Sequence, residues 1–515
     1  MVSTREERIE PQQAAHGRPR HLGLAAGAAL CSAVLFYFGT GLAPIAILTW
    51  LAPLPVLLLA TRAGGLLSAG TAFAAFLLGT ANMWWYQAHS GDEPLWPFGV
   101  LIDVSTALVF TFAVWVFWAL VRRHRVLLAS LAAPAAWTAV VHLIAVANPM
   151  GMMGTLANDQ GDVPLVLQAA SWAGMWGVEF LVLLPASAVA ALCAPGVARS
   201  ARVRTGATAV VLLVVFLGSS ALRLTGAEGR PHGMAAITQN AGYHWGPELG
   251  SPEGSALVQS YVRQIAALPP SVHLVVLPEA AFSAEEEWPA VLLGPMRRAA
   301  KAQNTTIVLG FEYYDRPGHH NYDYALAFPP DGGAPARYLK HHDLVSPRGH
   351  DLVFAPGAQV PTAMVICGDT NFPRPARDYT AAGARALAVP AELAASPDEG
   401  GGWQHSRNAL LRGVENGQSL AWSDANGNVV LADGYGRVVA EARTGGPAAF
   451  TTVTADVPAG PGDTAYTRFG DWFAWLCLLI VLIGLVATHP RIDRRVSGAS
   501  AGAADTGDRR TTNGS

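Results

Sequence analysis

The amino-acid sequence predicts a multi-pass α-helical membrane protein of about eight spans that carries an extracytoplasmic α/β domain. Three observations lead to this fold class. The 515 residues are 51% hydrophobic and only 14% charged, whereas a soluble protein carries about 25% charged residues. The apolar residues gather in runs of bilayer length. Arginines are concentrated in alternate loops between these runs, as is typical of loops on the cytoplasmic side of a membrane.

The predicted spans follow from the thickness of the bilayer. The hydrocarbon core is about 30 Å thick, so a spanning helix needs about 20 mostly apolar residues. The first two runs are short and close together, and a helical hairpin or one re-entrant unit is an alternative for them. The first run has no A-x-A cleavage site and precedes further spans, so we do not expect a cleaved signal. The runs cover residues 22–38, 45–60, 65–86, 98–121, 126–147, 165–192, 207–222 and 472–488.

The loop charges predict the orientation and the domain boundaries. Arginines lie at 62, at 122–125 and at 199–204, while loops 87–97 and 148–164 contain no Lys or Arg. Both termini are therefore expected in the cytoplasm and the long polar segment outside it. We predict a cytoplasmic segment (1–21), a membrane domain of about seven helices (22–222), an extracytoplasmic domain (223–470), a final helix (471–488) and a disordered cytoplasmic tail (489–515).

The extracytoplasmic segment has the pattern of a layered α/β domain. Short apolar runs bounded by Gly and Pro predict buried strands at 233–238, 273–277, 306–310, 324–328, 362–366 and 386–389. Helical candidates at 254–267, 289–303, 374–382 and 405–415 alternate with these strands. The later runs at 419–423, 428–432 and 438–442 are typical of hairpins.

Four polar residues stand where apolar runs end, which is where α/β folds gather their catalytic groups. Glu279 closes HLVVLPE, Lys340 follows an apolar pair in ARYLK, and Cys367 with Asp369 ends TAMVICGD. Cys367 is the single cysteine of the predicted outer domain. An unpaired thiol in an oxidising compartment is prone to oxidation, so its presence suggests a chemical use. A buried inert cysteine is the alternative.

Glu, Lys and Cys together form a complete set for acyl transfer. The carboxylate accepts the thiol proton and later activates the incoming nucleophile, while the ammonium stabilises the tetrahedral oxyanion. Taken singly, Glu279 and Lys340 would be ordinary surface charges. The pattern favours a cysteine nucleophile at Cys367 with Glu279 as its base and Lys340 as the oxyanion donor.

The order of these motifs resembles the nitrilase (carbon–nitrogen hydrolase) superfamily, and the flanking membrane runs are similar to its membrane branch, the apolipoprotein N-acyltransferase family. Further matches are Gln239-Asn240 followed by Trp245, and Trp403 with His405 ahead of RGVENGQSLAWSDAN at 412–426. TAYTRFGDW at 464–472 matches the stretch before the family's last span. The resemblance implies an αββα sandwich and a Glu279–Lys340–Cys367 triad.

The resemblance also implies a reaction and its partners. Cys367 would take an acyl chain from a phospholipid donor as a thioester and pass it to the N-terminal diacylglyceryl-cysteine amine of a lipoprotein. The site would lie at the outer face of a bacterial plasma membrane, in contact with membrane lipids and without a metal or another cofactor. Trp245 and Trp403 would be substrate-binding residues, and Asp369 or His350 would orient the lysine or the acceptor amine.

The chain departs from the family pattern at two places near the triad. The family has L-V-P-F-G-E after its lysine, whereas residues 344–350 are LVSPRGH, with His350 where the family has Glu. The cysteine is usually followed by an aromatic residue and Glu, and here by Gly368 and Asp369. A membrane-anchored amidase of the nitrilase family and a catalytically weak lipoprotein-binding homologue are therefore the alternative functions.

Other function classes fit the sequence less well. The net charge of -3 gives no basic field for nucleic acid. Four cysteines in 515 residues cannot form a disulfide framework. Histidines at 319, 320, 341, 342 and 350 lack an H-E-x-x-H motif or a cysteine pair, so solvated loop histidines are favoured over a metal site.

Overall fold

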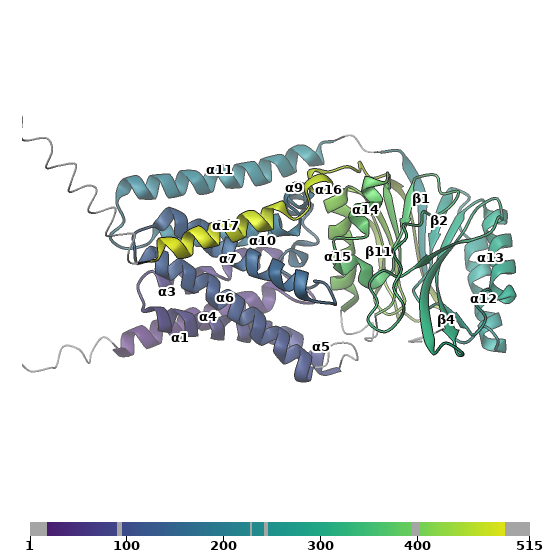
Figure 1. Ribbon diagram of the computed structural model, residues 1–515, viewed down its shortest axis with the longest axis horizontal. Helices are drawn as coiled ribbons and strands as arrows, with labels where there is room; N and C mark the ends of the chain where they lie inside the picture. The colour runs from purple at the N-terminus through teal and green to yellow at the C-terminus, as the bar shows by residue number, and fades with distance from the viewer. Residues whose placement is uncertain (1–17, 90–94, 227–228, 241–245, 394–400, 490–515) are drawn as a thin grey trace, which may run out of the picture.

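The computed structural model describes residues 18–89, 95–226, 229–240, 246–393 and 401–489. Two bodies lie end to end along its long axis, a bundle of helices and a sandwich of two β-sheets (Figure 1). The predicted terminal segments, 1–21 and 489–515, fall almost entirely outside the described residues.

Six helices of the described chain are long and apolar enough to cross a membrane. They are His21–Gly39, Gly65–His89, Leu95–Val121, Val126–Ala147, Met175–Leu192 and Arg199–Leu224. Two shorter apolar helices cover Ala46–Ala60 and Trp472–Ala487. The count of eight spans therefore stays a prediction for the two short segments. The elements are α1 (Arg18–Gly39), α4 (Gly65–Gly79), η1 (Thr80–Met83), α5 (Trp84–His89), η2 (Leu95–Gly99), α6 (Val100–Val121), α7 (Val126–Ala147), α10 (Met175–Leu192), α11 (Arg199–Leu224) and α17 (Trp472–Ala487).

Two of the predicted runs are interrupted rather than continuous. The run 45–60 is broken at Pro53, which separates α2 (Ala46–Leu51) from α3 (Leu54–Ala60), because proline has no N–H for the helical hydrogen bond. The run 165–192 contains α8 (Pro164–Leu167) and α9 (Ala170–Ala173) before α10. Gly174, at φ +69°, ends α9 and redirects the chain into α10.

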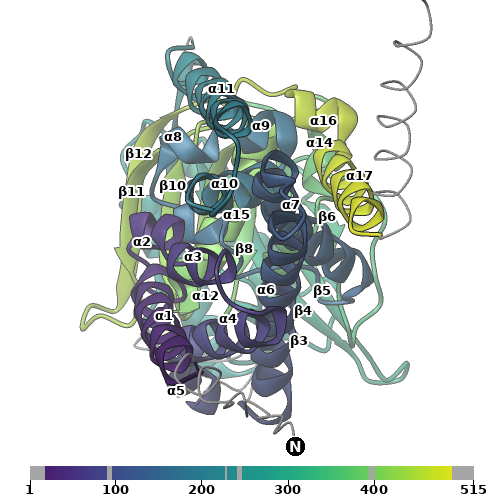
Figure 2. The same ribbon diagram turned by 90° about the vertical axis from the view of Figure 1, so that its left-hand side faces the viewer.

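Helix α7 lies at the centre of the bundle, in contact with α6, α10 and α17 (Figure 2). Its buried face is rich in small residues, and small side chains allow helices in a membrane to approach closely. The buried alanines of α7 are Ala129, Ala132, Ala133, Ala135, Ala136 and Ala139.

The second body contains two β-sheets. The larger has the order β12-β1-β2-β4-β5-β6, with β3 paired to β4, and the smaller the order β11-β10-β9-β8-β7. All six predicted single strands and the three hairpin strands are present. Three further strands, β3, β6 and β12, lack a continuous apolar run and were not predicted. The bounds are β1 (Pro231–Gln239), β2 (Val272–Val276), β3 (Phe282–Ala284), β4 (Thr306–Asp315), β5 (His320–Phe328), β6 (Ala336–Leu339), β7 (Thr362–Met364), β8 (Ala386–Ala391), β9 (Ser419–Asp424), β10 (Asn428–Ala432), β11 (Val438–Arg443) and β12 (Phe450–Pro458).

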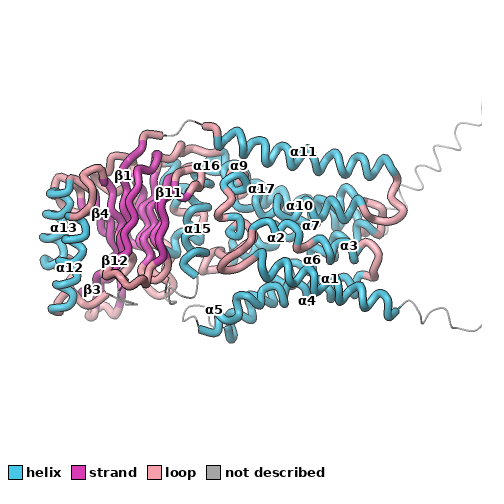
Figure 3. The backbone as a smooth tube through the Cα atoms, turned by 180° about the vertical axis from the view of Figure 1, so that it is seen from behind, coloured by secondary structure: helices cyan, strands magenta, loops and turns pink. Residues whose placement is uncertain are grey.

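Helices cover both outer faces of the two sheets, which gives the expected four-layer αββα order (Figure 3). Helices α12 (Pro252–Ala266) and α13 (Ala290–Gln303) lie on the larger sheet, away from the bundle. Helix α15 (Gly401–Asn416) packs on β9 and β10 and contacts α9 and η3 (Asn158–Gln160) of the membrane domain. Nearly all of its residues are buried, because it lies between the sheet and the bundle. The short helices α14 (Ala376–Ala381) and α16 (Ala465–Phe469) contact it.

A buried arginine joins the two bodies. The Arg407 side chain is 4% exposed, and its Nε donates to Asp162 Oδ1 at 2.7 Å. Its Nη1 and Nη2 donate to the two carboxylate oxygens of Glu441 at 3.0 and 2.8 Å. Asp162 belongs to the loop before α8, Arg407 to α15 and Glu441 to β11. One guanidinium therefore connects the membrane domain to the sandwich in the bidentate geometry that favours arginine.

We expect Arg407→Ala to destabilise the protein by about 2 to 3 kcal/mol, because it leaves two carboxylates without their cation. In detergent this would lower the apparent Tm by roughly 5 °C at a fixed scan rate. The control is Arg468→Ala, which removes an ion pair to Asp463 in which both side chains are more than half exposed. Equal Tm values for the two variants would contradict a joining role for Arg407.

Candidate active site

The three residues of the predicted triad line one cavity of about 560 Å³. Glu279 lies three residues after β2, Lys340 directly follows β6, and Cys367 begins η4 (Cys367–Asn371) beyond β7. These strands belong to both sheets, so the cavity forms where the sheets meet. The structure thus brings these three polar groups, predicted at the ends of apolar runs, into one cavity.

Glu279 is held by main-chain contacts from both sheets. Its N–H donates to Ala391 O at 3.2 Å, and its Oε2 accepts from the Glu392 N–H at 3.0 Å. The Glu279 backbone also passes so close to Gly310 of β4 that a Cβ at position 310 would lie 2.4 Å from Glu279 Cα. The carboxylate is thus fixed with Oε1 directed at the lysine.

Lys340 is paired with two carboxylates. Its Nζ lies 2.5 Å from Glu279 Oε1 and 2.9 Å from Asp323 Oδ2, and its side chain is 15% exposed. Burial alone would lower the pKa of Lys340, but the charges of Asp323 and Glu279 outweigh it and hold the pKa well above its usual value. The ammonium is therefore charged at neutral pH and can stabilise a nearby oxyanion.

Cys367 lies at a sharp turn between β7 and η4. Its φ of +32° is in the left-handed region, which is unusual for a residue with a side chain. The thiol donates to Glu392 O at 3.5 Å and lies 3.9 Å from His405 Nδ1. Burial and the charge of Glu279 raise the pKa of the thiol well above its usual value, against the effect of Lys340. The resting nucleophile is thus a thiol, and attack requires transfer of its proton.

Asp369 is a buried anchor for the cysteine turn. Its Oδ2 accepts from Tyr338 OH at 2.7 Å and Ile366 N–H at 3.0 Å, and its Oδ1 accepts from the N–H groups of His341 and His342 at 3.1 and 2.8 Å. Burial opposes the ionisation of Asp369. A hydrogen bond from the His342 side chain, followed by those from the Ile366 N–H and the Tyr338 hydroxyl, outweighs burial and holds the pKa of Asp369 below its usual value. Asp369 therefore ties the segment after Lys340 to the turn of Cys367.

The other predicted site residues lie elsewhere. Trp245 falls outside the described residues. Trp403 of α15 donates from Nε1 to Asp162 Oδ2 at 3.1 Å and packs against Arg407, at the joint between the two bodies. His350 has an exposed side chain whose ring lies 6.4 Å from that of His341. The structure brings neither Trp403 nor His350 to the lining of the triad cavity.

Several polar residues that line the cavity were not predicted as site residues. Among them are Glu312, Asp323, Glu392 and His405, and His405 was noted only as part of a family motif. Glu392 stands one residue after β8, so the strand-end signal that identified Glu279 would have found it as well. Glu312 and Asp323 lie inside strands and carry no such signal.

These groups leave the cavity rich in carboxyls. Burial and nearby charges, Glu279 first, raise the pKa of Glu392 to about 10. Burial and the charge of Asp323 raise the pKa of Glu312 to about 8. Burial and Lys340 lower the pKa of His405 to about 4, so its imidazole is neutral at pH 7. The protons on Glu392 and Glu312 limit the negative charge that surrounds the single ammonium of Lys340.

The lining of the cavity includes several apolar residues, and part of it belongs to the membrane domain. Pro149, Met150 and Met153 of the loop after α7 line it, together with Leu344 and Val345. Val345 is 92% exposed and Leu344 57% exposed. Apolar side chains held in the open at a site entrance suit contact with lipid.

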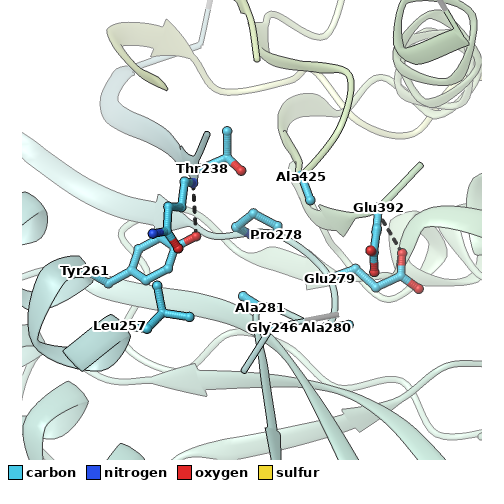
Figure 4. Close-up of a pocket in the computed structure, with 11 residues that line it drawn as sticks. Thr238, Gly246, Leu257, Tyr261, Pro278, Glu279, Ala280, Ala281, Glu392 and Ala425 are labelled. Atoms are coloured by element: carbon cyan, nitrogen blue, oxygen red, sulfur yellow. Dashed lines mark hydrogen bonds between the residues drawn. The ribbon is translucent and has the colours of Figure 1, made fainter. Parts of the chain in front are cut away.

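A second, smaller pocket lies behind the carboxylates, with a volume of about 30 Å³. Figure 4 shows Glu279 and Glu392 on one side of it and Tyr261 and Thr238 on the other.

In the described part of the chain, no group of three or more His, Cys, Asp or Glu side chains is placed to hold a metal ion.

Two models of known protein families match this chain, each over a different part of it. A sequence model described as carbon-nitrogen hydrolase matches residues 235–460. A model described as the apolipoprotein N-acyltransferase N-terminal domain matches residues 32–188. The chain belongs to the apolipoprotein N-acyltransferase family. The first match covers the sandwich and its cavity, and the second covers most of the helical bundle, so the family matches lie on both bodies.

Curated members of this family are distant in sequence. The apolipoprotein N-acyltransferase of Geobacter metallireducens is 26% identical over 353 residues, which are 61% of this chain and 66% of that protein. The enzymes of that name from Thermotoga maritima and Gloeobacter violaceus are 27% and 33% identical over 30% and 27% of this chain. These two matches span 31% and 26% of the relatives. Each match thus covers less than two thirds of the relative's length.

Solved structures that match part of the chain include proteins described as members of the nitrilase superfamily. Nit3 of Saccharomyces cerevisiae, described as a member of branch 10, is 18% identical, with a TM-score of 0.36 over 45% of this chain and 93% of that one. An amidase from Nesterenkonia sp. is 17% identical, with a TM-score of 0.37 over 48% of this chain and 95% of the amidase.

The environment of Cys367 predicts a high titration midpoint for its thiol. In a background with Cys31, Cys193 and Cys477 replaced by Ala, alkylation of Cys367 by iodoacetamide should rise with pH only above the range of a free cysteine peptide. Glu279→Gln should move this midpoint to lower pH by about one unit, because it removes the negative charge that opposes the thiolate.

The control for this titration is Glu253→Gln, which makes the same change at an exposed position of α12. It should leave the midpoint unchanged. A wild-type midpoint at or below that of free cysteine, measured by mass spectrometry of the alkylated peptide, would contradict the described environment.

Proposed function

We propose that the protein is an N-acyltransferase that moves an acyl chain from a phospholipid, through a thioester on Cys367, to the N-terminal diacylglyceryl-cysteine amine of lipoproteins. The observation that carries this proposal is the convergence of Glu279, Lys340 and Cys367 on one cavity that is lined in part by the membrane domain. The names of the curated relatives support the same activity.

In the first half-reaction the Cys367 sulfur bonds to the ester carbonyl carbon of the phospholipid, and the thiol proton passes to Glu279. The Lys340 ammonium hydrogen-bonds to the oxyanion of the tetrahedral intermediate. The carbon–oxygen bond to glycerol then breaks, and the leaving oxygen takes the proton from Glu279. The products are a lysophospholipid and the acyl-thioester of Cys367.

In the second half-reaction the acceptor amine bonds to the thioester carbon. Glu279 accepts a proton from the nitrogen and returns it to the departing sulfur of Cys367, which regenerates the thiol. The product is an amide on the N-terminal cysteine of the lipoprotein. These steps use the chain's own residues and no metal or diffusible cofactor.

The apolar residues that line the cavity support lipid substrates for both halves. Leu344, Val345 and Met150 are exposed around an opening that lies against the helical bundle. A donor and an acceptor held in the same membrane would reach the thiol at high effective concentration. A hydrolase of small soluble amides has no use for such an entrance.

The arrangement of α11 supports an extracytoplasmic site. Its 26 residues span about 39 Å. Its C-terminal end leads into β1, while Arg199, Arg202 and Arg204 lie at the opposite end, far from the sandwich (Figure 1). Because arginine-rich loops remain in the cytoplasm, we propose that the sandwich lies on the outer face of the plasma membrane with both termini inside.

Incubation of the purified protein with phospholipid that bears a labelled acyl chain should give a hydroxylamine-labile adduct on Cys367. Addition of a diacylated lipopeptide with a free N-terminal amine should move the label to that amine. Cys367→Ala should abolish both products, and Lys340→Met should slow adduct formation by about 10²- to 10³-fold.

Cys193→Ala is the matched control for this assay and should retain wild-type transfer, because Cys193 lies beside the end of α10 and outside the cavity. Release of the label only as free fatty acid would favour an amidase-like hydrolase. Binding of the lipopeptide without any adduct would favour a lipoprotein-binding homologue. Full transfer by Cys367→Ala would refute the thioester mechanism.

The proposed orientation predicts the accessibility of two introduced cysteines. In a cysteine-free background, Ala266→Cys on the exposed side of α12 should react with a membrane-impermeant maleimide in intact cells with a permeable outer layer. Ser200→Cys, at the arginine-rich start of α11, should react only after the plasma membrane is disrupted. The reverse pattern would place the sandwich in the cytoplasm.

A further inference from the structure

The register of the larger sheet aligns three charged residues across neighbouring strands. Glu312 of β4 is the direct partner of Asp323 of β5, and the next β5 residue, Tyr324, pairs with Leu339 of β6. Lys340 follows Leu339, and its N–H donates to Asp323 O at 3.0 Å. Directly opposed residues in a sheet place their side chains on the same face. Asp323 is therefore next to Lys340 because of strand pairing.

The Asp323 side chain makes a second contact with the same residue. Its Oδ2 lies 2.9 Å from Lys340 Nζ, and Asp323 is 6% exposed. A lysine has a flexible four-carbon stem, so a single anion leaves the ammonium free to pivot. Glu279 and Asp323 approach Nζ from different strands and fix its position between them.

The loop after Lys340 supplies no such carboxylate at position 350. The Gly349 N–H donates to Lys340 O at 2.8 Å, so this loop passes beside the lysine. The next side chain, His350, is exposed and does not line the cavity. The sequence resemblance puts a Glu of the family pattern at this position.

We propose that Asp323 is the positioning residue of Lys340, and that it holds the ammonium from β5 while Glu279 holds it from the end of β2. This inference rests on the proposed acyl-transfer chemistry of the triad. Asp323 acts through the lysine rather than on the substrate. It keeps Nζ charged and directed toward the oxyanion site.

Three variants test this role: Asp323→Asn, Asp323→Glu and His350→Ala. The probe is the 4-nitrophenyl ester of a short fatty acid in detergent micelles, with the burst of 4-nitrophenol recorded as a function of pH. An activated ester acylates the thiol without phospholipid recognition. Failure of the lipid assay with an intact ester burst would therefore reject the proposed substrate and not the role of Asp323.

Asp323→Asn should lower the acylation rate constant by about 10- to 100-fold while KM changes by less than about twofold. The alkaline limb of the pH profile should move to lower pH, because Lys340 loses one of the two carboxylates that raise its pKa. Asp323→Glu should recover a large part of the rate. His350→Ala should behave as wild type.

An unchanged rate and alkaline limb in Asp323→Asn would overturn the proposal. So would a loss of rate that Asp323→Glu does not restore in folded protein, as judged by an unaltered Tm. That outcome would mean that Asp323 serves the structure of β5 and not the charge of Lys340.

Discussion

The pairing of one buried ammonium with two carboxylates is the interaction on which the site depends. Lys340 directly follows β6, Glu279 lies three residues after β2, and Asp323 lies within β5. None of the three side chains is largely exposed. A buried charge without partners is costly, and a paired one is stable only in good geometry. The contact therefore fixes three strands relative to one another and holds the Lys340 ammonium in one position inside the cavity.

The membrane domain holds the nucleophile from the other side. The Met152 N–H donates to Asn371 O at the end of the cysteine turn, and a Cβ at Gly151 would lie 2.6 Å from the same oxygen. Arg407 joins α15 to Asp162 nearby. The buried apolar residues of the bundle and of the sandwich interior form one continuous cluster that includes Cys367. The thiol is thus rigidly placed relative to the bilayer, which suits lipid substrates.

Much of the site was predictable because its residues end apolar strands. Glu279 and Cys367 follow continuous buried runs, and the αββα order followed from the resemblance. Asp323 was hidden because it precedes the apolar part of β5 in a polar stretch, and its role arises from pairing with β6, a strand of four residues that was not predicted. Trp403 matched a family motif, but its indole bonds Asp162 at the joint, and no local pattern encodes that distant partner.

The sequence by itself determined that the chain has a helical membrane part and an α/β part. A helix that spans a bilayer requires a long apolar run and a buried strand requires a short one, and both kinds of run are visible in the sequence. It also marked Glu279, Lys340 and Cys367 as candidate site residues, since strand ends and motif order are local. Only the tertiary structure decided that the His350 side chain is exposed and that Asp323 contacts Lys340 Nζ. Strand register and side-chain direction depend on residues far apart in the chain. Contacts between such residues produce no repeating pattern in the sequence that would reveal them.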